Sequence, residues 1–213
     1  MTAELTSISA INAGAEIVLE IKLVEGDNFE KRKVILLARQ YAELRVHKGE
    51  IDQESAEQLF FEGEVCAAVK RGMNILGYTS CSQKNMALKL SSKGFSRDIA
   101  LRAAKYLAEL GYINEGDDAS REAERCLRKL WGRKRIAATL YEKGYSEGAV
   151  RLALSELEEY DFTEPCAQLI KRKFKALPDD REGQRKLFAS LVRYGYSSSE
   201  IKKAFEILAE KKS

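Results

Sequence analysis

The sequence predicts a mostly helical fold in which three tandem three-helix units, each helix-turn-helix-like, form an elongated curved solenoid preceded by a small N-terminal β-hairpin and helices. Three observations lead to this prediction. The 213 residues are rich in Ala, Leu, Glu, Lys and Arg, which favour helices, and include two prolines, Pro165 and Pro178. Hydrophobic residues make up 45% and charged residues 32%, a balance typical of a chain that folds around a core. The third observation is an internal repeat.

The repeat is centred on a triplet of glycine, an aromatic residue and serine. A leucine stands four positions before each glycine, and apolar residues recur six, nine, ten and thirteen positions after it. These spacings predict an amphipathic helix on each side of the triplet. The three copies, separated by 50 and then 51 residues, are Gly94-Phe95-Ser96, Gly144-Tyr145-Ser146 and Gly195-Tyr196-Ser197.

We interpret each triplet as a structural corner between two helices. The glycine can adopt the left-handed conformation that ends a helix, and the aromatic side chain then packs back onto the core. The serine oxygen is expected to accept from the first free N–H groups of the next helix. An acidic residue follows each serine in the first helical turn (Asp98, Glu147 and Glu200), where the helix dipole favours it.

Each repeat also has a helix before the corner pair. An apolar stripe runs from Ala123 to Trp131 and ends where Gly132 begins the next helix. The corresponding helices are expected at 65–76, with Ser82 capping the helix that follows, and at 165–177, with a break at 178–180. The chain therefore divides into an N-terminal extension (1–63) and three repeats (64–113, 114–162 and 163–213).

The N-terminal extension shows a different pattern. Apolar and polar residues alternate over 16–23, a turn follows at 26–28, and 32–37 can return as the partner strand. Two short helices, at 39–46 and at 53–61 with Asp52 as its cap, are expected to join this hairpin to the repeats.

The sequence shows no pattern typical of a catalytic or metal site. The four cysteines lie 15, 45 and 40 residues apart, too far for a local metal or redox motif, and are typical of buried thiols in a reducing compartment. Histidine occurs once, as His47, and glycine-rich phosphate loops are absent. The longest apolar run has five residues (34–38), far fewer than the roughly 20 that cross a membrane. We expect a cytoplasmic, monomeric protein that is not an enzyme, has no cofactor and contacts no membrane.

Charge is distributed unevenly along the chain. Residues 1–63 carry a net charge of −5, residues 64–118 of +2 and residues 119–213 of +6. Two basic clusters lie in the last segment, about one repeat apart. We predict that they form a basic track that binds nucleic acid or an acidic groove of a partner protein. The alternative is that each cluster is simply a solvated helix face. The first basic cluster comprises Arg121, Arg125, Arg128, Lys129, Arg133, Lys134 and Arg135, and the second comprises Lys171, Arg172, Lys173, Lys175, Arg181, Arg185 and Lys186.

The repeats, the corners and two local motifs together resemble the RecX family of regulators of the bacterial recombinase RecA. The motifs are Trp131-Gly132-Arg133-Lys134-Arg135-Ile136, and Gly111-Tyr112-Ile113 followed by Asp117-Asp118. The resemblance covers about residues 64–211. It implies a protein that lies in the groove of the RecA nucleoprotein filament and modulates, mainly by inhibition, its ATPase, strand-exchange and coprotease activities in DNA repair and the SOS response. The resemblance then makes the basic clusters the candidate contacts with the filament or with DNA. Both single-stranded and double-stranded DNA are candidate partners.

Two alternatives remain open at this stage. Three-helix units with a basic helix also resemble helix-turn-helix modules, which would make the chain a DNA-binding protein without sequence specificity. A peptide-binding helical scaffold is less favoured, because the repeated aromatics are better explained by packing at the corners.

Overall fold

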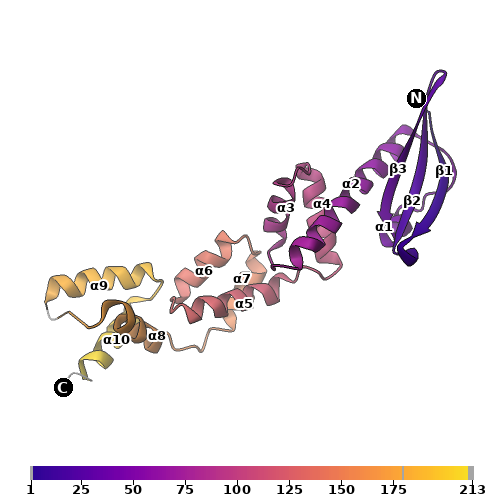
Figure 1. Cartoon of the computed structure of the whole chain (residues 1–213). Coiled ribbons are helices and arrows are strands. Elements are labelled where there is room, and N and C mark those ends of the chain that lie inside the picture. Colours follow the sequence, from indigo (N-terminus) through magenta and orange to yellow (C-terminus); the bar gives the residue numbers. More distant parts are fainter. Residues whose placement is uncertain (1, 179, 211–213) are drawn as a thin grey trace. The chain divides into compact units, whose positions relative to one another are not determined.

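The computed structural model describes residues 2–178 and 180–210, and the chain is mostly helical (Figure 1). It divides into two compact units. Unit 1 comprises Met1–Thr79 and Met86–Tyr112, and unit 2 comprises Ser80–Asn85 and Ile113–Ser213. Among the described residues, no helix is both long and apolar enough to cross a membrane.

Unit 1 begins with a four-stranded antiparallel sheet. The strands are β1 (Thr2–Ile11), β2 (Glu16–Glu25), β3 (Asn28–Leu37) and β4 (Gly49–Ile51), in the order β3-β2-β1-β4, with a 3-10 turn at Asn12–Gly14. The predicted hairpin is present as β2 and β3, but β1 and β4 were missed. In β1 the buried hydrophobic residues are Ala3 and Leu5, and the rest is rich in threonine and serine. Its pairing with β2, rather than its own hydrophobic pattern, makes it a strand.

Two helices follow the long strands: α1 (Ala38–Leu44) and α2 (Gln53–Leu76). The sheet residues Leu19, Ile21 and Leu36 are buried in one core with Ala56 and Leu59 of α2. Asp52 caps α2 as predicted, its carboxylate accepting from the Ser55 amide at 2.7 Å.

The prediction of two separate helices, at 53–61 and 65–76, is wrong, because α2 is continuous through both ranges. A β-carbon on Gly63 would lie 2.8 Å from Cγ1 of Val34 in β3. Gly63 therefore allows β3 to pack close to α2, and it does not interrupt the helix. The expected boundary between 63 and 64 falls inside this helix.

Unit 1 also contains α3 (Gln83–Ser91) from Met86 onward and the whole of α4 (Arg97–Glu109). Gly72 of α2 lies against Leu107 of α4, and Tyr106 of the same helix is fully buried. Small residues on one face of α4, Ala103 and Ala104 among them, are also buried, so α2 and α4 pack closely.

Unit 2 contains α5 (Glu115–Arg128), α6 (Arg133–Glu142), α7 (Glu147–Ser155), α8 (Thr163–Leu169), α9 (Arg181–Arg193) and α10 (Ser198–Glu210). The α-helix predicted for 165–177 is shorter, because α8 passes into a π-helical turn at Ile170–Phe174. Asp180 caps α9 by accepting from Gly183, while Asp179 of the predicted break lies outside the described residues. The core includes Cys166, Ile136 and Leu191.

The three corners share one backbone geometry. Gly94, Gly144 and Gly195 have φ angles of +98°, +77° and +94°, and each following aromatic amide donates to the carbonyl of the leucine five residues before it. Tyr145 and Tyr196 are buried, whereas Phe95 is half-buried.

The serine hydroxyl caps the following helix in two of the three corners. Ser96 accepts from the Ile99 amide, and Ser197 forms a capping box with Glu200. The expected cap at Ser146 is wrong, because its hydroxyl makes no capping hydrogen bond. Its backbone amide instead donates to Oε2 of Glu115 at 3.0 Å.

Replacing Gly144 with alanine should lower the free energy of unfolding by about 1 to 2 kcal/mol, since a β-carbon resists the left-handed backbone. Gly148 is the matched control, because it lies in α7 with open space where a β-carbon would stand. Gly148→Ala should be neutral or stabilising by up to about 1 kcal/mol. Urea unfolding of both variants measures the difference, and equal effects would contradict the corner geometry.

Tyr145 should make the stability of unit 2 sensitive to alkaline pH. Burial raises the pKa of its phenol to about 12, against about 10 for an unfolded tyrosine. Because the folded state holds this proton more tightly, the neutral phenol contributes to the free energy of unfolding. That contribution is full below about pH 10 and is lost as the pH rises through about 12. Urea unfolding across this pH range should show a smaller decline for Tyr145→Phe than for the wild-type chain, and an identical decline would contradict the burial of this phenol.

Candidate interaction surface

The start of α6 packs directly against the corner that precedes α10. The amide of Gly132 donates to the carbonyl of Tyr194 at 2.8 Å, and the amide of Lys134 donates to the carbonyl of Gly195 at 3.1 Å. A β-carbon on Gly132 would collide with the backbone of Gly195 and Tyr196. Glycine is therefore required at 132 by the close approach of two backbones. We call this contact the 132/195 joint.

The joint places three large side chains in one stack. The guanidinium carbon of Arg135 lies 4.1 Å from the ring centroid of Trp131 and 5.1 Å from that of Tyr194. The ammonium of Lys129 lies 5.0 Å from the Trp131 ring, and that of Lys173 lies 4.7 Å from the Tyr194 ring. Cations at these distances from aromatic faces are attracted by the ring quadrupole. We call these five residues the cation–aromatic ladder.

The ladder joins the two basic clusters predicted from the sequence. Lys129 and Arg135 come from the first cluster, and Lys173 comes from the second. Lys173 also donates a hydrogen bond to the Tyr194 hydroxyl. Among the described residues, no carboxylate lies within ion-pair distance of any of the three cations, so the ladder carries an uncompensated positive charge. Lys129 and Lys173 are exposed at its two ends.

The cations on α5 are held differently. Arg121 donates to Asp118 at 2.8 Å, and Arg125 donates to Glu122 at 3.1 Å. The hydrogen bond that Arg121 donates to Asp118 is the main cause that raises the pKa of the Arg121 guanidinium. Arg128 lies 3.9 Å from Glu124. These arginines remain exposed, but partner carboxylates on the same helix offset their charge.

Arg133 has a role that the sequence did not indicate. Its guanidinium donates to the carbonyl of Leu154 at 2.7 Å and to that of Leu157 at 3.4 Å. Arg133 thus satisfies carbonyl groups at the C-terminal end of α7, where a positive charge also favours the helix dipole. Its neighbour Lys134 is exposed.

The second basic cluster lies on two elements. Lys171, Arg172 and Lys175 are exposed at the π-helical turn or just after it. On α9, Lys186 pairs with Glu182 at 2.7 Å. Arg181 and Arg185 line a shallow cavity of about 280 Å³, together with Gln184, Phe188 and Phe205.

Two aromatic members of the ladder, Trp131 and Tyr194, were not among the predicted contact residues. Trp131 was placed on an apolar stripe, and in the structure it is half-buried beneath Arg135. A signal was available, because Trp131 stands inside a basic run and Tyr194 directly precedes the corner glycine. Only the packing of α6 on that corner brings them together.

The described residues contain no group of three or more His, Cys, Asp or Glu side chains arranged to hold a metal ion. All four cysteine side chains are buried. Burial raises the pKa of the Cys166 thiol to about 12, so this thiol stays protonated at neutral pH.

No protein-family model matches the chain, but individual proteins do. The regulatory protein RecX of Pelodictyon phaeoclathratiforme is 30% identical over 147 residues, which cover 66% of this chain and 88% of that protein. The chain belongs to the RecX family. The regulatory protein RecX of Clostridium perfringens strain 13 is 27% identical over 144 residues, 68% of each chain.

Solved structures show the same fold in other RecX proteins. A crystal structure of a regulatory protein RecX matches with a TM-score of 0.69 at 19% identity, covering 94% of this chain and 98% of that one. The structure of RecX from Lactobacillus salivarius matches with a TM-score of 0.59 at 21% identity, covering 68% of this chain and 97% of that one.

In this RecX family member, Arg133→Ala should lower the free energy of unfolding by about 1 kcal/mol, because carbonyl groups at the end of α7 lose a charged donor. Lys134→Ala is the matched control, and its effect should stay within about 0.5 kcal/mol. Arg133→Lys should restore little, since an ammonium cannot reach both carbonyls as the guanidinium fork does. Urea unfolding measures all three, and an unchanged Arg133→Ala variant would contradict the capping role.

Proposed function

We propose that this chain binds the nucleoprotein filament of RecA and modulates it, mainly by inhibiting its ATPase, strand-exchange and coprotease activities in DNA repair and the SOS response. It acts by binding, without catalysing a reaction of its own. The observation that carries the proposal is the cation–aromatic ladder, seen together with membership of a family of regulatory proteins. The filament offers both phosphate groups and protein grooves to such a surface.

The physical argument rests on how the ladder holds its charges. Stacking between Trp131 and Tyr194 fixes the Arg135 guanidinium, so little side-chain entropy is lost when it meets an anion. Lys129 and Lys173 at the ends add charges that no carboxylate among the described residues offsets. A planar cation and flexible lysines suit phosphate oxygens or an acidic protein groove.

We further propose that the chain consists of an N-terminal extension (1–63) and three tandem three-helix repeats of one solenoid (64–113, 114–162 and 163–213). The continuous helix α2 then belongs partly to the extension and partly to the first repeat. A second joint, one period before the 132/195 joint, supports this division into repeats. The hydroxyl of Ser82 donates to the carbonyl of Lys143 at 2.8 Å, and the Glu115 carboxylate accepts from the amides of Gln83 and Ser146. In both cases the start of a middle helix meets the next corner. A monomer in the cytoplasm would then bind through several weak contacts.

A second candidate function is direct binding of DNA without sequence specificity. The cavity between α9 and α10 favours it, because Phe188 and Phe205 offer aromatic surface beside Arg181 and Arg185. Among the described residues these two arginines have no carboxylate partner. Aromatic faces and cations together suit the stacked bases and phosphates of single-stranded DNA.

Replacing Lys129 and Lys173 together with alanine should weaken binding to RecA filaments on single-stranded DNA about tenfold, because two exposed charges of the ladder are lost. The slope of log affinity against log salt should fall by about two. The measurement is fluorescence anisotropy over a salt series, with inhibition of ATP hydrolysis recorded in parallel.

The matched control replaces Lys202 and Lys203, two exposed lysines of α10 outside the ladder. It should keep nearly wild-type affinity and inhibition. Equal losses in the two double variants would contradict the ladder as the contact surface. Binding to free DNA as tight as to filaments, with no effect on ATP hydrolysis, would favour the second candidate function.

A further inference from the structure

Strand β3 forms one edge of the unit 1 sheet and pairs only with β2 in the described sheet. It is ten residues long, and about half of its backbone N–H and C=O groups point away from β2. Cys66 of α2 hydrogen-bonds to the Leu37 backbone at the end of the strand, whereas residues 28–33 are exposed, so this first part of the edge is open to another strand. An edge of this length is a template for strand addition, in which an extended peptide extends the sheet.

A line of three hollows runs along α2, and β3 lines the first two of them. The first, of about 480 Å³, lies between the start of β3 and α2, and the second, of about 420 Å³, shares Arg32 and Phe60 with it. The third, of about 490 Å³, shares Ala67 and Lys70 with the second and extends to Lys93. The hollows follow one another along α2, so together they form a groove that begins beside β3 and ends in a hollow with no β3 residue in its lining. We call it the β3/α2 groove.

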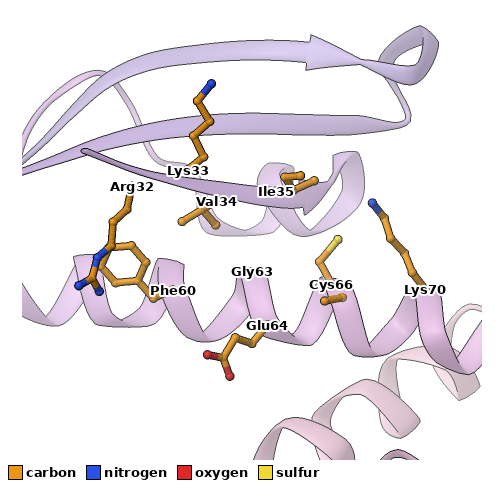
Figure 2. A pocket seen from close by; sticks show the side chains of 10 residues that line it. Arg32, Lys33, Val34, Ile35, Phe60, Gly63, Glu64, Cys66 and Lys70 are labelled. Atoms are coloured by element: carbon orange, nitrogen blue, oxygen red, sulfur yellow. The ribbon is translucent and has the colours of Figure 1, made fainter. Parts of the chain in front are cut away.

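The floor of the groove suits apolar side chains. In Figure 2, Phe60 and Cys66 point from α2 toward β3, and Val34 points from the strand toward the helix. Gly63 brings Val34 close to the α2 backbone, and Ala67 is small and exposed. Every second side chain of an added strand would point toward this floor.

The charges of the groove are uneven along its length. At the end away from the β2–β3 turn it is lined by Lys70, Arg71 and Lys93, with no acidic residue in that hollow. Lys70 is paired with Glu16 at 2.7 Å, whereas no described carboxylate pairs with Arg71 or Lys93. Glu64, at the middle of the groove, is turned away from β3 in Figure 2.

We propose that the β3/α2 groove is a docking site for an extended peptide segment of a partner protein, apolar at alternate positions and acidic at one end. The peptide pairs with the free edge of β3, its apolar side chains lie over Phe60 and Ala67, and its acidic end meets Arg71 and Lys93. This site is separate from the ladder in unit 2 and does not depend on the role proposed for the ladder.

A second copy of this chain is a poorer occupant. The centre of β3 carries Lys31, Arg32 and Lys33 in succession, with Lys31 and Lys33 on the face away from α2. In an antiparallel pair of two β3 strands centred there, these like charges would stand opposite one another, which is destabilising. A peptide with no basic residue opposite Lys31 and Lys33 avoids this repulsion.

The probe is a fluorescein-labelled ten-residue peptide of alternating valine and threonine that ends in three glutamates. We expect saturable binding to the full-length chain by fluorescence anisotropy, with amide shifts in β3 by NMR. Ala67→Glu places a charge on the groove floor and should weaken binding about tenfold, as should Lys93→Glu at the basic end. The matched controls, at exposed positions outside the groove, are Ala42→Glu and Lys48→Glu, and both should bind the peptide like the wild-type chain.

Two altered peptides separate the parts of the proposal. Methylation of alternate backbone amides blocks hydrogen bonding to a strand edge and should abolish binding, so equal binding would overturn strand addition. A peptide ending in three lysines should bind at least about tenfold more weakly, and equal binding would overturn the acidic specificity. No saturable binding of the original peptide, or sedimentation showing a dimer that excludes it, would overturn the site as a whole.

Discussion

The close approach of the Gly132 and Gly195 backbones is the contact on which the interaction surface of unit 2 depends. Two hydrogen bonds hold it, and both partners must lack a side chain, since a β-carbon on either would collide with the other segment. Once α6 starts at that point, Trp131, Arg135 and Tyr194 are forced into one stack. The hydroxyl of Tyr196 adds a bond to the Leu130 carbonyl at 2.8 Å, so the corner is fastened from both sides. A packing constraint on glycine thus positions charges on the surface.

Residues that look equivalent in the basic clusters are separated by the fold into three roles. Arg121 and Arg125 face carboxylates of their own helix, and Arg133 serves the end of α7. Only the ladder cations are fixed by aromatic faces and left without an opposite charge among the described residues. Net charge therefore overstates the surface that is available to an anionic partner. Unit 1 presents a different kind of surface. The β3 edge has backbone groups that can form hydrogen bonds with another strand, and the β3/α2 groove is lined in part by apolar side chains.

Sequence reasoning succeeded where a feature depends on neighbours in the chain and failed where it depends on distant contacts. The β2–β3 hairpin follows from local alternation, and the cap at Asp52 follows from local spacing. Strand β1 was missed because its pattern is weak until it pairs with β2. The continuity of α2 was missed because Gly63 resembles an interruption unless Val34 is known to lie against it. Ser146 was misassigned because Glu115, 31 residues earlier, takes its amide.

By itself, the sequence determined the helical class, the periodic corners, the position of the basic clusters and the resemblance to the RecX family, because each is written in local spacing and composition. The tertiary structure alone decided which basic residues share a surface, that Arg133 supports the fold, and that β3 is an open edge beside a groove. The physical reason is that these properties arise between side chains tens of residues apart, as between Trp131 and Tyr194. Such side chains meet only when packing has fixed the helices and strands that carry them.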